Sequence, residues 1–206
     1  MKTILHLSSS IFAEGGQSSR LAEEFVAALR LEDPGAEVIR RDLARDPVPH
    51  LDAERFGAFL AKPEARTPGQ AAVIGYSDAL IAELKDADTI VLGLPMYNFG
   101  LPSQLKAYFD HVARAGVTFK YTDKGAVGLL GGKKAFVFAA RGGLYQGTPR
   151  DTQSAYVRDF LAFLGITDVQ FVYAEGLAIS EASKSRSLAA ARDALRALVQ
   201  PAALAA

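Results

Sequence analysis

The chain has 206 residues, half of them hydrophobic, which is the length of one domain with a full core. Its 23 basic and 23 acidic residues give a formal net charge of zero, so electrostatics gives no reason to expect nucleic acid or an anionic membrane as a partner. The absence of cysteine excludes disulfides, thiolate nucleophiles and thiolate metal sites. The first apolar run is too short for a signal peptide. We therefore predict a single domain over residues 1–200, a frayed tail over 201–206 and a cytoplasmic location.

Short apolar runs alternate with helical patterns along the chain. Strands are predicted at residues 3–7, 37–40, 89–92, 134–140 and 169–174, and a small hairpin within 117–130. A first helix is predicted to follow Ser19 and to end at Pro34, and further helices are predicted at residues 53–60, 71–84, 103–115, 152–164 and 182–198. This alternation predicts an α/β fold with a five-stranded parallel sheet in the flavodoxin-like order 2-1-3-4-5 and helices on both faces.

The segment from Asp88 to Leu105 carries the first candidate site. It opens with a β-branched apolar run that is typical of a strand buried on both faces, and Pro95 ends that run because proline has no N–H to donate. The loop that follows contains Met96, Tyr97, Asn98 and Phe99. In open α/β sheets ligands bind at such strand ends, and these side chains suit a flat heteroaromatic ring. An ordinary strand-to-helix turn explains the same spacing equally well.

The loop from Ser9 to Ser19 leaves the first strand and enters a helix. The free N–H groups and positive dipole end of a helix N-terminus attract phosphate, and Ser10, Gln17 and Ser18 add neutral donors. The loop contains no lysine and neither GxGxxG nor GxxxxGK[ST], so a monophosphate fits it better than a pyrophosphate or triphosphate. Helix capping alone would also explain the serines.

A third loop runs from Ala140 to Tyr145. Its Gly142–Gly143 pair allows backbone N–H groups to approach a ring closely, although a plain flexible turn would have the same composition. All three loops are predicted at adjacent strand ends. Their joint occurrence favours a flavin mononucleotide (FMN) site, in which the bound ring supplies the chemistry.

Other chemistries find little support in the residues. His6, His50 and His111 are far apart, and none has a metal-ligand spacing, so we predict no metal site. His6 is predicted to be packed and His111 to lie on a helix face. Asp42 is predicted to be a surface or capping residue, because the glycine fingerprint of a dinucleotide fold is missing. No GxSxG elbow is present, and a nucleotide hydrolase would need a phosphate lysine and metal carboxylates that we do not find.

Seven segments of the sequence share one resemblance. They are SSS at 8–10, QSS at 17–19, PMYNF at 95–99, QLKAYFDHVARAGVTFKYT at 104–122, GKKA at 132–135, RGG at 141–143 and FLGITDV at 163–169. Together they resemble the FMN-dependent NADH-azoreductases, which are flavodoxin-like quinone and azo reductases. The similarity runs in register from the first strand to near Glu175, and the long middle segment is its most specific part.

The resemblance implies a set of FMN contacts. They fall on Ser10, Gly16, Gln17, Ser18, Met96, Tyr97, Asn98, Phe99, Ala140, Arg141, Gly142 and Gly143. Gly16 and Ala140 stand where the family often has a serine, so a hydroxyl contact is lost at each, while backbone contacts could survive.

The resemblance also implies a homodimer with sites at the subunit interface, where Phe119, Tyr121 and Phe163 would line the pocket over the flavin. The implied mechanism is ping-pong: NADH or NADPH delivers a hydride to the flavin N5, and a quinone or azo compound then takes the same position. The N–H groups of Gly142 and Gly143 are candidates to stabilise the negative charge that develops near N1 and O2. Asn98 is the candidate to orient N5.

A second function remains open, that of a flavodoxin-like electron carrier or FMN-binding regulator without its own NADH reaction. A carrier needs an open flavin edge. The long proline-containing segment 43–70 is predicted to form a wall or lid, which argues against a carrier.

Overall fold

The computed structural model describes residues 2–199, so the predicted frayed tail at 201–206 lies outside the described residues. Five strands form a parallel sheet in the order β2-β1-β3-β6-β7, which confirms the predicted flavodoxin-like arrangement. These strands are β1 (Thr3–Ser8), β2 (Glu37–Asp42), β3 (Thr89–Pro95), β6 (Lys134–Ala140) and β7 (Asp168–Ala174). A separate antiparallel hairpin consists of β4 (Phe119–Thr122) and β5 (Gly125–Gly128), as predicted.

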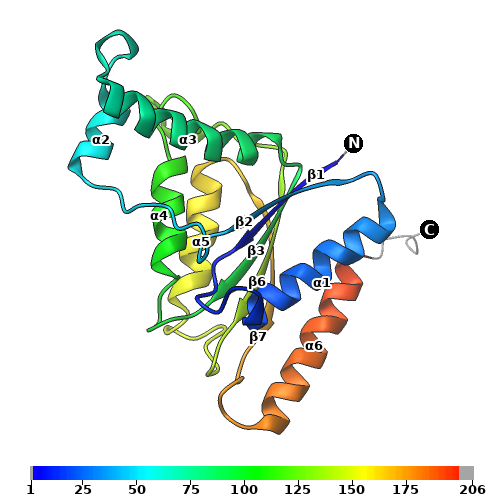
Figure 1. The fold of residues 1–206 in the computed structure, drawn as a ribbon. Coiled ribbons are helices and arrows are strands. Elements are labelled where there is room, and N and C mark those ends of the chain that lie inside the picture. The colour runs from blue at the N-terminus through cyan, green and yellow to red at the C-terminus, as the bar shows by residue number, and fades with distance from the viewer. Residues whose placement is uncertain (1, 200–206) are drawn as a thin grey trace.

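Helices cover both faces of the sheet (Figure 1). One face carries α1 (Gln17–Glu32) and α6 (Glu181–Val199), and the other carries α3 (Pro68–Asp86), α4 (Ser103–Val112) and α5 (Thr152–Phe163). The apolar face of α1 packs on β6, where Phe25 lies 4.7 Å from Phe136 and 5.1 Å from Phe138 between ring centroids. β3 is buried over its last six residues because helices cover it on both sides.

The strand register brings the three predicted loops to the same edge of the sheet. Ser8 is paired with Gly93, and Pro95 is paired with Ala140, so neighbouring strands end at nearly the same level. The Ser9 hydroxyl donates to the Gly93 carbonyl at 2.7 Å, which fixes the first loop against β3. Pro95 is therefore the last paired residue of β3, whereas the sequence predicted that the strand would end before it.

The helix predicted at 103–115 ends earlier, at Val112. The buried Thr118 hydroxyl accepts a hydrogen bond from the Arg114 backbone N–H at 2.9 Å and donates to the Val112 carbonyl at 2.6 Å. This side chain replaces the bonds of a further helical turn, and the chain then turns into the hairpin through Gly116, whose φ is +78°.

The segment predicted as a wall or lid does not cover the site of its own chain. It carries α2 (Ala53–Leu60), which lies beside α3 and away from the edge where the strands end (Figure 1). Phe59 of α2 lies 5.9 Å from the His111 ring and 5.4 Å from the Arg114 guanidinium. Both partners lie at or beyond the last turn of α4, whereas the predicted FMN loop precedes its first turn. For a site within one chain, the lid prediction is therefore wrong.

Candidate functional site

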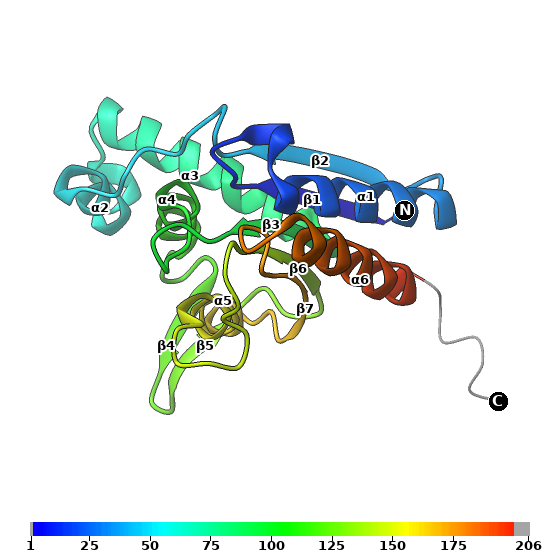
Figure 2. The same cartoon turned by 90° about the horizontal axis from the view of Figure 1, so that it is seen from below.

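The three predicted loops line one hollow of about 380 Å³ at the carboxyl edge of the sheet, the edge that faces the viewer in Figure 2. Nine of the predicted cofactor residues line it: Ser10, Gly16, Gln17, Ser18, Met96, Tyr97, Ala140, Arg141 and Gly142. The hollow also includes Phe12, Gly15, Pro95, Leu177 and Lys184, which the sequence reasoning did not identify. Leu177 and Lys184 follow the last strand, where no recognisable motif pointed to a site.

One end of this hollow has unused hydrogen-bonding capacity suited to an anion. α1 begins there after Gly16, and no side chain caps it. The first N–H groups of a helix have no intrahelical partner, so they point out of the helix end. The Ser18 side chain is fully buried, and its hydroxyl finds no hydrogen-bond partner within residues 2–199. Because a buried hydroxyl is costly to leave unpaired, these groups fit a phosphate monoester.

Steric contact with Ser10 explains why position 16 is a glycine. A Cβ there would lie 2.2 Å from the Ser10 Oγ and 2.6 Å from the Ser10 Cβ. Ser10 thus occupies the space that a serine at position 16 would need. The Ser10 hydroxyl itself lies 3.3 Å from the Tyr97 hydroxyl, which joins the first loop to the second.

The loop after β3 has a strained backbone that neighbouring groups hold in place. Asn98 and Phe99 have φ values of +50° and +63°, a region that costs a non-glycine residue about 1 kcal/mol or more. The buried Gln153 side chain donates from Nε2 to the carbonyls of Pro95 and Gly100, each at 2.9 Å. The Thr152 hydroxyl donates to the Phe99 carbonyl. The first turn of α5 therefore clamps this loop, a role that the sequence reasoning missed because Gln153 is 54 residues from Phe99.

Asn98 and Phe99 lie beside the hollow rather than in it. Asn98 lines an adjoining hollow of about 540 Å³, which shares Met96 and Tyr97 with the first. The half-exposed Phe99 ring packs edge-to-face on Tyr145 at 5.7 Å between ring centroids.

Gly143, the other predicted residue outside both linings, is covered by Tyr145. A Cβ at Gly143 would lie 2.7 Å from the Tyr145 hydroxyl, so the bare backbone makes room for that ring. Of the two glycines, only Gly142 lines the hollow of about 380 Å³.

The side chain of Arg141, a residue at which the resemblance implies an FMN contact, is held by acidic neighbours instead of being free for a ligand. The guanidinium is fully buried and forms ion pairs with Asp151 at 2.8 Å and Glu175 at 3.0 Å. Burial opposes ionisation of Asp151, but the hydrogen bonds from Arg141 and Ser154 outweigh it and leave the pKa of this carboxyl lowered. Only the backbone of Arg141 is left to contact a ligand, and its charge is not free for a 2′-phosphate.

The Glu175 carboxylate continues this network. It accepts hydrogen bonds from the backbone N–H groups of Tyr145 and Gln146, each at 3.0 Å. The Arg141–Glu175 pair therefore holds the loop after β6 in place.

The aromatic residues predicted to line the substrate pocket form a cluster elsewhere. Phe119 lies 4.3 Å from Phe163 and 5.4 Å from Tyr121 between ring centroids. Phe163 is the last residue of α5, whereas the hollow lies near the first turn of that helix. Twelve helical residues span about 18 Å, so these aromatics cannot line the hollow of their own chain.

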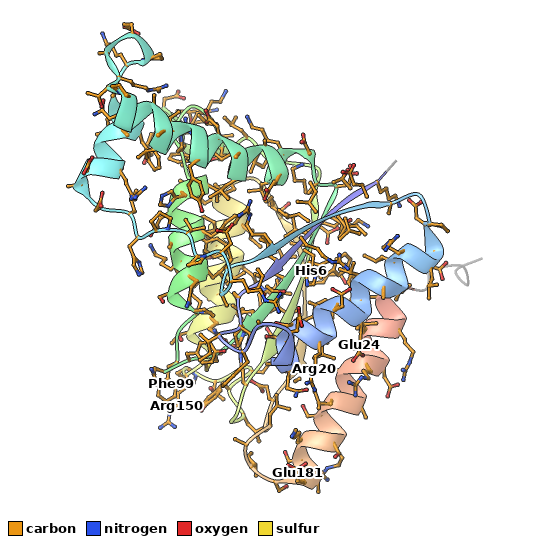
Figure 3. All side chains as sticks on the ribbon, viewed as in Figure 1. His6, Arg20, Glu24, Phe99, Arg150 and Glu181 are labelled. Atoms are coloured by element: carbon orange, nitrogen blue, oxygen red, sulfur yellow. The ribbon has the colours of Figure 1, made fainter. Side chains whose placement is uncertain are left out.

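A third and larger hollow, of about 640 Å³, lies over β1, β2 and α1 and has no predicted role. Its labelled residues His6, Arg20 and Glu24 are seen in Figure 3, far from Phe99. His6 is packed, as predicted, with its Nδ1 3.3 Å from a Glu23 carboxylate oxygen. Each acidic residue that lines this hollow has a basic partner: Glu24 pairs with Arg192, Glu23 with Arg40, and Glu14 and Asp42 with Arg45.

Two further expectations can be compared with the structure. Asp42 caps the turn that follows β2, since its carboxylate accepts hydrogen bonds from the Ala44 and Arg45 N–H groups, in agreement with the predicted capping role. His111 lies on α4 but is fully buried rather than on an open face, with Nδ1 3.0 Å from the Ala107 carbonyl. Among residues 2–199, no group of three or more histidine, aspartate or glutamate side chains could hold a metal ion. Of the helices in that range, none combines the length and apolar character that crossing a membrane requires.

Comparisons with known proteins agree with this geometry. The family described as having a flavodoxin-like fold matches residues 2–199. An FMN-dependent NADH:quinone oxidoreductase of Cellvibrio japonicus is 54% identical over 192 residues, which cover 93% of this chain and 96% of the relative. FMN-dependent NADH:quinone oxidoreductase 6 of Burkholderia lata is 53% identical and covers 96% of this chain and 100% of its own.

A solved structure adds a relative with bound cofactor. The crystal structure of an FMN-dependent NADH-azoreductase from Bacillus anthracis in complex with FMN is 26% identical to this chain, with a TM-score of 0.86. The alignment covers 97% of this chain and 100% of that chain.

Proposed function

Because this chain belongs to the flavodoxin-like family of FMN-dependent NADH:quinone oxidoreductases, we propose that it binds FMN at its three loops and reduces quinones and azo compounds with NADH. The observation that carries the proposal is the buried Ser18 hydroxyl, which has no hydrogen-bond partner among the residues that the structure describes and lies at an uncapped helix N-terminus in the same hollow as both other loops. When bound, FMN would supply the hydride-transfer chemistry of the family.

The residues of the chain hold, orient and enclose the cofactor in this proposal. Ser10, Gln17 and Ser18, with the N–H groups that open α1, would hold the phosphate. Met96 and Tyr97 would pack along the cofactor, since they line both adjoining hollows. The backbone N–H of Gly142 would stabilise charge near N1 and O2, and we propose that Gly143 contributes less because Tyr145 covers it. Asn98 would orient N5 through its backbone.

We also propose a homodimer in which Phe119, Tyr121 and Phe163 line the flavin pocket of the partner subunit. Two observations support this arrangement. The cluster is too far from the hollow of its own chain, and the Tyr121 side chain, 74% exposed, is open to contact by a second subunit. Light scattering would test the state of assembly, and a monomer that reduces quinones at full rate would refute the shared site. A cytoplasmic location completes the proposal, supported by the absence of cysteine.

An anaerobic titration separates this function from that of an electron carrier. The purified protein, loaded with FMN, should be yellow and should bleach on addition of NADH under argon. Steady-state NADH oxidation with menadione or methyl red should then follow ping-pong kinetics. A protein that binds FMN but is not reduced by NADH would instead be the carrier, and a protein that binds no FMN would refute both functions.

The choice of pyridine nucleotide is tested in the same assay. Arg141 lines the hollow of about 380 Å³, but its guanidinium is already paired with Asp151 and Glu175, so it is not free to bind the 2′-phosphate that distinguishes NADPH from NADH. We propose NADH as the preferred donor, in agreement with the names of the relatives.

A further inference from the structure

We propose that Lys184 of α6 is a specificity residue for the phosphate monoester of FMN, which supplies from the far end of the chain the cation that the phosphate loop lacks. This inference rests on the proposed FMN site and adds a residue to it. The juxtaposition that carries it is Lys184 in the same hollow as Ser10, Gly16, Gln17 and Ser18.

The hollow has two basic side chains in its lining, Arg141 and Lys184. The charge of Arg141 is already neutralised by the largely buried carboxylates of Asp151 and Glu175. Lys184 has one acidic neighbour, Glu181, whose carboxylate is 3.6 Å from Nζ and whose side chain is 88% exposed. An ion pair so open to water holds a lysine weakly. Lys184 is therefore the cation that is available to an anion in this hollow.

The position of Lys184 in its helix also argues for a ligand. It is the fourth residue of α6, within the first turn, where the positive end of the helix dipole disfavours a cation. The charge of a lysine is unfavourable at this place in the helix, and the exposed ion pair with Glu181 offsets this only weakly. α1 and α6 lie side by side, and α6 starts farther from the sheet than α1 does (Figure 1, Figure 2). Lys184, one turn into α6, lines the same hollow as the start of α1 and brings a positive charge to it.

The anion expected there is a phosphate monoester dianion rather than a carboxylate of the acceptor. Ser18 offers a buried hydroxyl, and the uncapped start of α1 offers backbone N–H groups. A phosphate has three terminal oxygens, so it can accept from these neutral donors and from Lys184 together.

The test compares FMN with riboflavin, which lacks the phosphate. Affinities are measured by quenching of flavin fluorescence for the unmodified protein, Lys184→Gln and the matched control Arg186→Gln. Arg186 lies on the same helix two residues on, is exposed and does not line the hollow. Lys184→Gln should weaken FMN binding by about tenfold and riboflavin binding less than about twofold, as expected for one charge-assisted contact. Arg186→Gln should change neither, and the thermal midpoint of ligand-free Lys184→Gln should not fall.

The outcomes separate this inference from the function on which it rests. FMN binding that is undiminished in Lys184→Gln, or that falls equally for both flavins, would overturn the inference alone. A fall in ligand-free stability that accounts for the lost affinity would show a structural role and would also overturn it. Absence of FMN binding by the unmodified protein would overturn the proposed function, and the inference with it.

Discussion

The clamp that Gln153 places on the loop after β3 yields a quantitative prediction. In Gln153→Met the side chain keeps its length and loses both donors. The Gly100 carbonyl would keep the hydrogen bond from the Tyr97 N–H at 3.1 Å, so the main loss is at the buried Pro95 carbonyl. Leaving such a group unpaired costs about 1–3 kcal/mol. The Gln153 Oε1 is itself buried without a partner in the described part of the chain, and its removal returns part of that cost.

We therefore expect Gln153→Met to lower the free energy of unfolding by about 2 kcal/mol, which for a chain of this size lowers the thermal midpoint by about 4–8 °C. The positive φ values of Asn98 and Phe99 persist because α5 holds the loop, so FMN affinity should fall as well. Urea unfolding and flavin fluorescence measure the two effects. Gln146→Leu is the control, since its side chain is exposed near the same loop. Unfolding and FMN binding that both match the unmodified protein would refute the clamp.

Three further predictions follow from other parts of the site and core. Arg141→Met should lower the free energy of unfolding, measured with urea, by about 3–5 kcal/mol, because it leaves the largely buried carboxylates of Asp151 and Glu175 without their cation. Adding Glu175→Gln should recover part of the loss, and equal stability of the single and double variants would contradict this. Gly16→Ala should weaken FMN binding because its Cβ would meet Ser10, and Ser10→Gly in the same chain should restore part of it, whereas additive losses in fluorescence titrations would exclude the steric cause. Burial lowers the pKa of His6 and of His111, so as the pH falls these histidines bind protons in the unfolded chain at a higher pH than in the folded protein. The free energy of unfolding should therefore fall as the pH decreases below about 6.5. His111→Phe should lose less stability between pH 7.5 and 5.5 than the unmodified protein, and an unchanged pH dependence would argue against the buried neutral histidine.

Much of the fold could be predicted from local patterns. The run at residues 134–140 is a strand with those same bounds, and α2 spans Ala53–Leu60, because their apolar spacing and flanking turn residues agree with the tertiary environment. The helix predicted at 152–164 is also found, with Asp151 as its N-cap, since the Asp151 side chain accepts a hydrogen bond from the Ser154 N–H. The end of α4 was missed because Thr118, a residue six positions beyond the helix, ends it through a buried hydroxyl.

The site could be predicted as loops but not as side-chain roles. Adjacent strand ends follow from sheet topology, so the meeting of the three loops was predictable. The fates of Arg141, Gly143 and the Phe119 cluster depend on contacts between residues far apart in the chain. The Arg141 guanidinium is paired with Glu175, 34 positions away, and Lys184 of the last helix lines the hollow. No local pattern encodes such pairings, because they are set by how β7 and α6 pack on the finished sheet.

A crystal structure of the protein with FMN tests the central claim most directly. We predict one FMN per chain, with its phosphate at the start of α1 beside Ser18 and its ring at the loops after β3 and β6. FMN bound elsewhere, or the three loops closed on one another with no cofactor between them, would contradict the account.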